Sequence, residues 1–373
     1  MMELPADLIL SDILPRLPAK SVVRFRSVCK QWNSFLKTSM FYNLHHHHLL
    51  TGCNMNTRYH HQKLLVSIKN PSVKLFSIDC EAPDDGFLRH VTPAPLEEAI
   101  CVSILTSCNG MTCLGMRKEK EWMYDMVFDD LILWNPFTSE YKRLSKTNSH
   151  AECYMETYDG FTMYYSSSED DYRILRTVKK SGNAYIYSLK SDSWRKLVIT
   201  TSAAVALGSY NWMPSVVLDE KVFILNSYEE DIWIIRFDTK TEKFTKMETH
   251  FRKRKFSRHV IDRGCFHVRV RHCYSDGMGL EVLRMNGDGD WTVMGTYFVK
   301  GDLDPYKFQP LHLMSNGNWL MRYQGCLYNV DMNMVNNGNN CDPLNGKEEM
   351  CITTEVKYIE TFVSPNRYMQ TSS

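Results

Sequence analysis

The sequence predicts a mainly β protein, in which an N-terminal module of three short helices precedes a β-propeller of about six blades. The first forty or so residues are rich in Leu, Ile, Val and Pro at helical spacing, whereas the chain from about Leu64 onward is aromatic and strand-like nearly to its end. In that second part a short pattern recurs with a period near 50 residues. Such a period is typical of propeller blades.

The composition is that of an ordinary globular protein. Of 373 residues, 43% are hydrophobic, 12% aromatic and 23% charged, and the formal net charge is +1. Because no overall field draws such a chain to nucleic acid or to an anionic membrane, neither role is expected. No basic segment leads into an apolar run at the N-terminus, and the longest charge-free stretch, residues 197–218, is too polar to span a membrane. The 12 Cys are scattered without a CxxC pair, which favours reduced thiols in the cytoplasm or nucleus.

Three short helices are expected at the N-terminus. Pro5 suits a first helical turn, Pro18 can begin a second helix, and Ser27 can cap a third. So small a module has more large apolar side chains than its own interior can cover. The surplus indicates either a partner site or a docking surface for the rest of the same chain, and the residues alone leave both alternatives open.

Residues 4–32, LPADLILSDILPRLPAKSVVRFRSVCKQW, closely resemble the F-box. That family binds the Skp-type linker of SCF (Skp–cullin–F-box) ubiquitin ligases through an apolar helical surface. The resemblance implies that this surface and the small core beneath it contain Leu4, Pro5, Leu8, Ile9, Ile13, Leu14, Leu17, Pro18, Val22, Val28, Cys29 and Trp32. It does not separate residues that face the partner from those that face inward. Arg24 and Arg26 either pair with acids or form a solvated face.

Residues 45–62 are predicted to be a linker between an F-box at residues 1–44 and the large domain. Four consecutive histidines, His45 to His48, raise the alternative of a metal site. Consecutive side chains on one segment cannot all converge on one ion, and no Cys or carboxylate lies at ligand spacing. A solvated connector is therefore favoured, with no metal or other cofactor.

The large domain, predicted at residues 63–363 with a tail at 364–373, repeats one hairpin ending. In three clear units an apolar strand is followed by a residue that can bond its own backbone, namely Asn135, Ser188 and Asp238. Six residues after each of them stands an aromatic residue, which should oppose the preceding strand of the hairpin. A fourth unit has the same aromatic, and the four residues lie 53, 50 and 47 positions apart, at Tyr141, Trp194, Phe244 and Trp291. This is the spacing of a kelch-like blade.

The blade count and the closure of the ring follow from weaker copies. VKLFSID before the first clear unit and CLYNVDM after the last bring the count to about six, and TTEVKYIETFVSP can pair with the first blade to close the ring. A β-sandwich is the main alternative, but it does not explain the period. Three tryptophans on the pattern are expected in blade cores, namely Trp134, Trp194 and Trp291.

The large domain also resembles a known family. SCNGMTCLGMR, LILWNPFTSEYKRL and YIETFVSP are similar to landmarks of the plant F-box-associated interaction domain, and the S-locus F-box proteins of self-incompatibility belong to the same group. With the F-box, the resemblance covers essentially the whole chain. It implies a non-catalytic substrate-recognition subunit of an SCF-type E3 ubiquitin ligase, whose partners are a Skp-type linker, then cullin and a RING subunit, and a target protein.

Two rival functions remain open. A protein could bind the Skp-type linker without cullin and have no ligase output. A kelch-like propeller could instead carry a copper oxidase centre, for which the candidates are His259, His267, His272, Cys273 and Tyr274, but the sequence shows no convergence of these residues.

Target recognition is expected in loops of the propeller. The basic run FRKRKFSRH contains Arg252, Lys253, Arg254 and Lys255 and could be a solvated loop, a nuclear import signal or a site for an acidic partner. Trp212 breaks the repeat pattern between two blades and is the other candidate for target binding.

Overall fold

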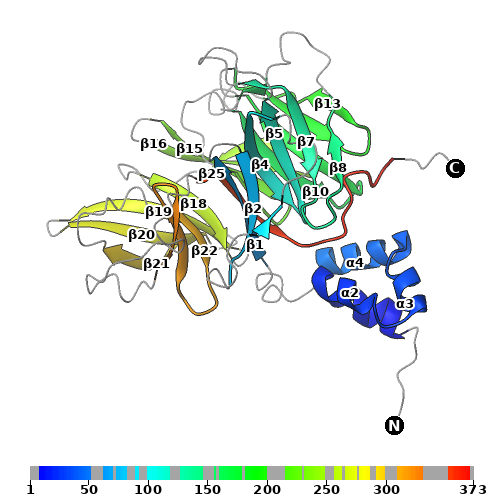
Figure 1. Cartoon of the computed structure of the whole chain (residues 1–373). Coiled ribbons are helices and arrows are strands. Elements are labelled where there is room, and N and C mark those ends of the chain that lie inside the picture. Colours follow the sequence, from blue (N-terminus) through cyan, green and yellow to red (C-terminus); the bar gives the residue numbers. More distant parts are fainter. Residues whose placement is uncertain are drawn as a thin grey trace.

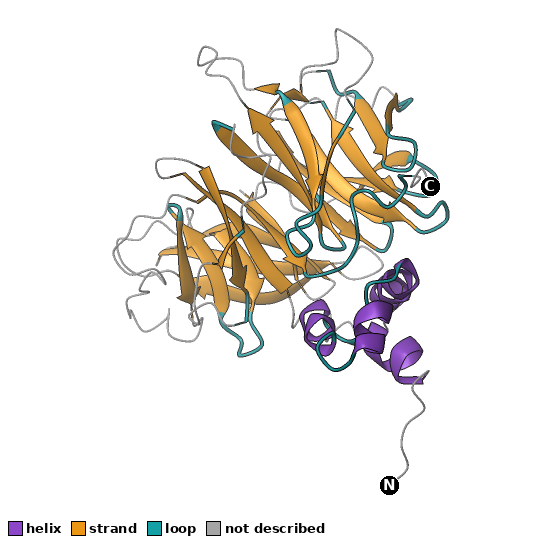
Figure 2. Cartoon of the chain, turned by 45° about the vertical axis from the view of Figure 1, so that its right-hand side comes forward, coloured by secondary structure: helices purple, strands orange, loops and turns teal. Residues whose placement is uncertain are grey.

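A small group of helices stands beside a ring of β-sheets (Figure 1). The computed structural model describes residues 8–51, 62–69, 73–81, 89–91, 99–117, 127–145, 155–156, 159–178, 181–199, 215–228, 231–247, 256–262, 265–274, 277–285, 291–298, 309–330 and 352–369. Figure 2 shows that the helices gather on one side of the sheets. Among the helices within these ranges, none is both long and apolar enough to cross a membrane.

The helical module, residues 8–51, is built from five short segments: η1 (Ile9–Ile13), η2 (Leu14–Arg16), α2 (Ala19–Phe25), α3 (Lys30–Phe35) and α4 (Ser39–Thr51). Pro18 precedes α2, as predicted. Ser27 does not cap the next helix, because its hydroxyl donates to the carbonyl of Arg24 at 2.7 Å. The cap of α3 is Cys29, whose sulfur accepts the backbone N–H of Trp32 at 3.4 Å. The prediction of three helices also missed α4.

The sheets of the propeller follow one another along the chain as antiparallel blades. The first contains β25 (Ile352–Ile359), β1 (Gln62–Lys69), β2 (Val73–Asp79) and β3 (Arg89–His90). The second contains β4 (Cys101–Cys108), β5 (Met111–Arg117), β7 (Asp130–Trp134) and β8 (Tyr141–Arg143). The third contains β10 (Gly160–Ser166), β11 (Asp171–Thr177), β12 (Ala184–Ser188) and β13 (Ser193–Lys196).

Two further blades complete this series. The fourth contains β14 (Val216–Leu218), β15 (Lys221–Tyr228), β16 (Asp231–Asp238) and β17 (Lys243–Met247). The fifth contains β18 (Phe256–Asp262), β19 (Cys265–Tyr274), β20 (Gly277–Met285) and β21 (Trp291–Phe298).

Within the described residues there are five four-stranded blades, so the predicted count of about six is wrong. The sheet β22 (Gln309–Leu313), β23 (Trp319–Tyr323) and β24 (Cys326–Val330) lies between the fifth and first blades and has three strands. A ribbon of β6 (Val127–Phe128) and β9 (Met155–Glu156) is additional. CLYNVDM contributes its strand, β24, to this smaller sheet and not to a sixth four-stranded blade.

The last strand closes the ring, as the sequence predicted. β25 pairs antiparallel with β1, for example Glu355 with Val66, so the end of the chain completes the first blade. Successive blades then bury apolar side chains against each other. Trp134 is 1% exposed in one of these clusters, which confirms its predicted place, and Trp194 packs half-buried on Tyr187 with ring centroids 5.2 Å apart. The side chain of Trp291 lies outside the described part.

The predicted hairpin chemistry is confirmed in three blades. The aromatic residue opposes the preceding strand in each: Trp134 with Tyr141, Tyr187 with Trp194, and Phe237 with Phe244. The polar residue six positions earlier accepts backbone N–H groups of its own turn, as its residue type predicted; these acceptors are Asn135, Ser188 and Asp238. Four residues after it the backbone is left-handed in all three turns, with φ of 63°, 49° and 54° at Ser139, Asp192 and Glu242.

Candidate partner-binding surfaces

Apolar side chains gather on the exposed surface of the helical module. Nine large hydrophobic side chains are exposed in the described part of the chain, and five of them belong to this module: Leu8, Ile13, Val23, Val28 and Met40. Val28 and Met40 are the most open of the five, at 58% and 61%. So many exposed apolar groups on so small a module indicate a surface for a partner protein.

The twelve residues that the F-box resemblance assigned to linker binding divide into an outer and an inner group. The exposed members are Leu8, Ile13, Val28 and Cys29. The buried and half-buried members are Leu14, Val22, Ile9, Leu17, Pro18 and Trp32. Leu4 and Pro5 lie outside the described residues. The motif did not include Val23 or Met40, which the structure adds to the exposed group.

Another side of the helical module is joined to the propeller by Phe362. This side chain is 6% exposed and belongs to the apolar core of the module, together with Leu36 and Phe41. Its ring stacks on Tyr42 with centroids 5.0 Å apart, and it meets the edge of His45 at 5.2 Å. Docking on the same chain therefore accounts for one part of the surplus apolar surface, and the part that stays exposed leaves a partner site as a prediction.

Arg26 belongs to this junction, and among the described residues it forms no ion pair with an acid. Its Nη2 donates to the carbonyl of Leu36 and to the hydroxyl of Tyr42, both at 3.3 Å. The guanidinium also lies 5.4 Å from the ring centroid of Phe362.

The histidine run belongs to α4 and its first two members are buried, so the expected solvated connector is wrong at this point. His45 and His46 are only 2% and 5% exposed. The ring of His45 contacts the carbonyl of Leu17 at 3.1 Å through Nε2, and Nε2 of His46 contacts the hydroxyl of Tyr172 on β11 at 2.7 Å. A run of four histidines does not indicate burial in the sequence, because the residues that contact His45 and His46, Leu17 and Tyr172, lie far from them in the chain.

Burial controls the charge of these two histidines. It lowers the pKa of His45 to about 4, because removal from water disfavours the imidazolium. Burial likewise lowers the pKa of His46 to about 4, and the Arg367 guanidinium beside it adds to the effect. Both side chains are therefore neutral at pH 7.

Asn135 holds the chain that carries Phe362. Its side chain is fully buried, and its amide nitrogen donates to the carbonyls of Thr361 and Val363 at 2.9 and 2.8 Å. Its Oδ1 accepts the backbone N–H of Phe137 at 2.8 Å, which starts the β7–β8 turn. The Asn of the Trp-Asn-Pro segment therefore serves both the hairpin and the C-terminal segment, a second role that the sequence pattern did not reveal.

A third attachment lies further along the C-terminal segment. Arg367 donates to the Asp170 carboxylate at 3.0 Å and contacts Nδ1 of His46 at 2.9 Å. The hydroxyl of Tyr368 donates to the carbonyl of Asp170. Because Asp170 lies in the turn between β10 and β11, the third blade also takes part in the junction.

All these attachments lie on one face of the propeller. The turn face is defined by the tight turns at residues 109–110, 135–140 and 167–170, which precede the second or fourth strand of a blade. Because neighbouring strands of a blade run in opposite directions, the fourth strand starts at the turn face and ends at the opposite face. The chain therefore passes to the next blade at that opposite face. Residues 197–215 connect the end of β13 to the start of β14, and residues 248–255 connect the end of β17 to the start of β18. These strand ends belong to the face opposite the turn face.

The predicted target-binding residues fall within these two connectors. Trp212 lies in the first, and Arg252, Lys253, Arg254 and Lys255 lie in the second. All five lie outside the described residues, so their contacts stay predictions. The fourth blade begins with β14, after the first connector, and ends with β17, before the second.

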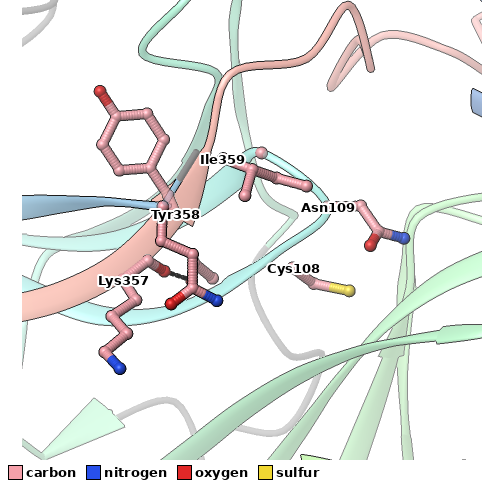
Figure 3. A pocket seen from close by; sticks show the side chains of 8 residues that line it. Cys108, Asn109, Lys357, Tyr358 and Ile359 are labelled. Carbon is pink, nitrogen blue, oxygen red and sulfur yellow. Dashed lines mark hydrogen bonds between the residues drawn. The ribbon is translucent and has the colours of Figure 1, made fainter. Parts of the chain in front are cut away.

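A shallow pocket opens beside the inner strand of the first blade (Figure 3). Its labelled lining residues come from the ends of two strands, with Cys108 and Asn109 from the β4–β5 hairpin and Lys357 and Ile359 from β25. The hydroxyl of Ser107 donates to the carbonyl of Lys357 across it. Gln62, the first residue of β1, also lines this pocket, and no ligand is assigned to it.

The described side chains contain no group of three or more His, Cys, Asp or Glu that could hold a metal ion. The residues considered for a copper centre lie on β18 and β19: His259, His267, His272, Cys273 and Tyr274. Their side chains are outside the described part, so the structure does not test that alternative.

Comparison with known proteins identifies the family. A model of the F-box domain matches residues 1–44, and a model of the F-box associated beta propeller domain matches residues 64–267. Among curated proteins of Arabidopsis thaliana, F-box protein At3g08750 is 29% identical over 65% of this chain and 59% of its own length. F-box protein At1g11810 is 28% identical over 66% and 61%. F-box/kelch-repeat protein At3g23880 is 25% identical over 97% and 96%.

The alignments to the first two of these relatives span about three fifths of their length, whereas the third aligns almost from end to end. The two matched models have the same order as the helical module and the propeller, and the second begins within β1 and ends within β19. The chain therefore belongs to the plant F-box proteins that carry an F-box associated beta propeller domain.

Proposed function

We propose that this protein is the substrate-recognition subunit of an SCF-type E3 ubiquitin ligase. The helical module docks on a Skp-type linker, and the linker brings cullin and a RING subunit. The propeller binds target proteins, which are then ubiquitinated and degraded by the proteasome. In this role the chain catalyses nothing itself, and it raises the effective concentration of the target beside the conjugating enzyme in the cytoplasm or nucleus.

One observation carries the proposal: the module keeps an exposed apolar surface although it is already docked on its own propeller. Leu8, Ile13 and Val28 are 41%, 38% and 58% exposed. Full burial of a fully exposed side chain of this kind contributes roughly 1.5–3 kcal/mol. Because these three are already about half covered, a partner that covers the rest gains about 2–4 kcal/mol in all. A surface needed only for intramolecular docking would be covered by the contact with Phe362.

For target binding we propose the face opposite the turn face. The helical module and residues 361–369 occupy the turn face at the second and third blades, through contacts with Asn135, Tyr172 and Asp170. Connectors between blades are the segments in which binding residues concentrate. The basic run at residues 252–255 favours an acidic segment of the target, and Trp212 would supply an aromatic contact.

The test is capture of a Skp-type linker and cullin by the full chain. A Leu8→Asp/Val28→Asp variant should lose both, with linker affinity falling at least about tenfold, because two charges would be desolvated in the interface. The matched control is Val198→Asp, since Val198 is fully exposed on the propeller and the change should leave capture of the linker and cullin unaltered.

The outcomes separate the alternatives. Capture of the linker without cullin would favour a non-ligase binding protein. Capture that survives the double substitution would place the partner on another surface and overturn the proposed one.

A further inference from the structure

The C-terminal segment, residues 361–369, runs between the helices and the propeller after the ring-closing strand β25 (Figure 1). We infer that this segment is a positioning element, which fixes the orientation of the F-box relative to the propeller so that ubiquitin is delivered to a restricted region. This inference rests on the proposed ligase function, and Phe362 is its central residue.

The first step is the contact of the segment with the helical module. Phe362 lies between Tyr42 and His45 on one side and Phe137 on the other, with centroid distances of 5.0, 5.2 and 5.4 Å. Phe137 belongs to the β7–β8 turn. One buried ring therefore contacts the helical module and the second blade together.

The second step is the attachment of the segment to the propeller on both sides of Phe362. Before and after this residue, the carbonyls of Thr361 and Val363 accept from the buried amide of Asn135. The hydroxyl of Thr361 also donates to the carbonyl of Asn109 at 2.8 Å. The backbone that carries Phe362 is thus held to two turns of the second blade.

The third step is a separate contact with the third blade. Arg367 bridges Asp170 and His46, and His46 reaches the hydroxyl of Tyr172 at 2.7 Å. Asn109 donates to the same hydroxyl at 3.2 Å. Attachments at two places, Phe362 and His46, restrain rotation of the module about either one.

Fixed geometry has a chemical consequence for a ligase. Linker, cullin and conjugating enzyme are carried on the F-box, so the orientation of the F-box decides which lysines come within reach of the charged enzyme. The effective concentration of the charged enzyme at a given lysine falls when the F-box becomes free to rotate relative to the propeller. Loss of the segment's contacts should therefore spread modification over more lysines and slow it at the preferred ones.

The experiment measures orientation and ligase output on the full chain. Fluorophores introduced as unnatural amino acids at the exposed positions Lys20 and Lys243 report the distance distribution between F-box and propeller. In parallel, the reconstituted complex with linker, cullin, RING subunit and conjugating enzyme is allowed to modify lysines of the propeller itself, and peptide mass spectrometry maps them. Phe362→Ala is compared with Phe244→Ala, which removes a half-buried ring in the fourth blade, away from the junction.

Phe362→Ala is expected to broaden the distance distribution, to scatter the modified lysines and to leave linker affinity unchanged, whereas Phe244→Ala should do none of these. If Phe362→Ala does not fold, Tyr172→Phe removes the hydroxyl that contacts His46 and Asn109, and Arg367→Ala removes the contacts with Asp170 and His46. Each variant leaves the Phe362 contacts in place and should give a smaller broadening. A narrow distribution in all junction variants, or a broad one with unchanged lysine sites, would overturn the inference. A wild-type complex that captures no cullin and modifies nothing would contradict the proposed function instead, and the distance measurement would still report on the junction.

Discussion

Phe362 lies flat on Tyr42, with ring centroids 5.0 Å apart and ring planes 6° from parallel. Tyr42 belongs to α4 and Phe362 follows the last strand, so one aromatic stack joins the two ends of a 373-residue chain. A stack of this kind contributes about 0.5–1.5 kcal/mol beyond the burial of the two rings.

A double-mutant cycle measures that contribution. Tyr42→Leu and Phe362→Leu each keep apolar volume and remove the stack, so together they should destabilise the protein less than the sum of the single changes. The expected coupling is about 1 kcal/mol in urea unfolding. Tyr42→Leu combined with Phe244→Leu is the control and should be additive, and additivity in the first pair as well would mean that the stack has no energetic role.

Gly110 is required by the C-terminal segment as well as by its turn. Its φ is +89°, and a Cβ there would overlap the side chain of Thr361 and lie 2.8 Å from the carbonyl of Ile359. Gly317 has the same φ of +89° with nothing within 4 Å of a Cβ. Gly317→Ala should therefore cost only the backbone strain, about 1–2 kcal/mol.

Gly110→Ala should cost that strain plus about 1–3 kcal/mol for the overlap. Thermal unfolding of the two variants gives the difference directly. Equal destabilisation would show that the segment can move aside, and that its contact with the second blade is loose.

Asn135 and Asp238 occupy equivalent turn positions, but replacing each by the other residue type should destabilise the protein to very different extents. Asn135→Asp replaces a donor to two carbonyls by a carboxylate in a fully buried place, which should cost about 3 kcal/mol or more. Asp238→Asn keeps the oxygen that accepts the N–H groups of Lys240 and Thr241, so the expected cost is within about 1 kcal/mol. Chemical unfolding checks both, and tolerance of Asn135→Asp would contradict the bonding assigned to Thr361 and Val363.

Acid should weaken the junction through His45 and His46. Their pKa of about 4 lies below the ordinary value of 6.5, so between these values the unfolded chain binds more protons than the folded one. Stability is therefore complete above about pH 6.5 and falls as the pH drops toward 4. When the pH falls from 7 to 5.5, each buried histidine should lower the free energy of unfolding by about 1 kcal/mol.

The measurement is the free energy of unfolding against pH for wild type and His46→Gln. The groups that face His46 are Tyr165, Tyr172, Arg367 and Asp170, and the glutamine leaves all of them in place. The variant should lose about half of the slope that the two histidines produce. An unchanged slope would show that His46 titrates at its ordinary pKa in the folded protein.

The regular parts of this fold could be predicted because they depend on local chemistry. Asn135, Ser188 and Asp238 start their turns by bonding their own backbone, and an aromatic residue six positions later must oppose the strand before it. The period of these units then indicated a propeller. The count failed at the β22–β24 sheet, where the repeat is too degraded to show how many strands belong to it.

The junction could not be predicted, because each of its contacts joins residues distant in sequence. His45 and His46 look solvated until Phe362, Tyr172 and Arg367 are placed around them. The F-box resemblance named the apolar residues of the module but not their directions, since helical spacing alone does not say which side a second domain covers. Cys29 was missed as a helix cap for a simpler reason, because a sulfur is a weak acceptor and Ser27 stood close by.

Hydrogen exchange of the full chain, with and without a Skp-type linker, tests the central claim most directly. The claim is that the helical module binds its partner with one surface while another stays docked on the propeller. Amides at residues 8–13 and 26–32 should become more protected, while those at 41–46 and 361–369 keep the protection they have in the free protein. Loss of protection at 41–46 and 361–369 would contradict the account, because the linker would then compete with the propeller for the same side of the module.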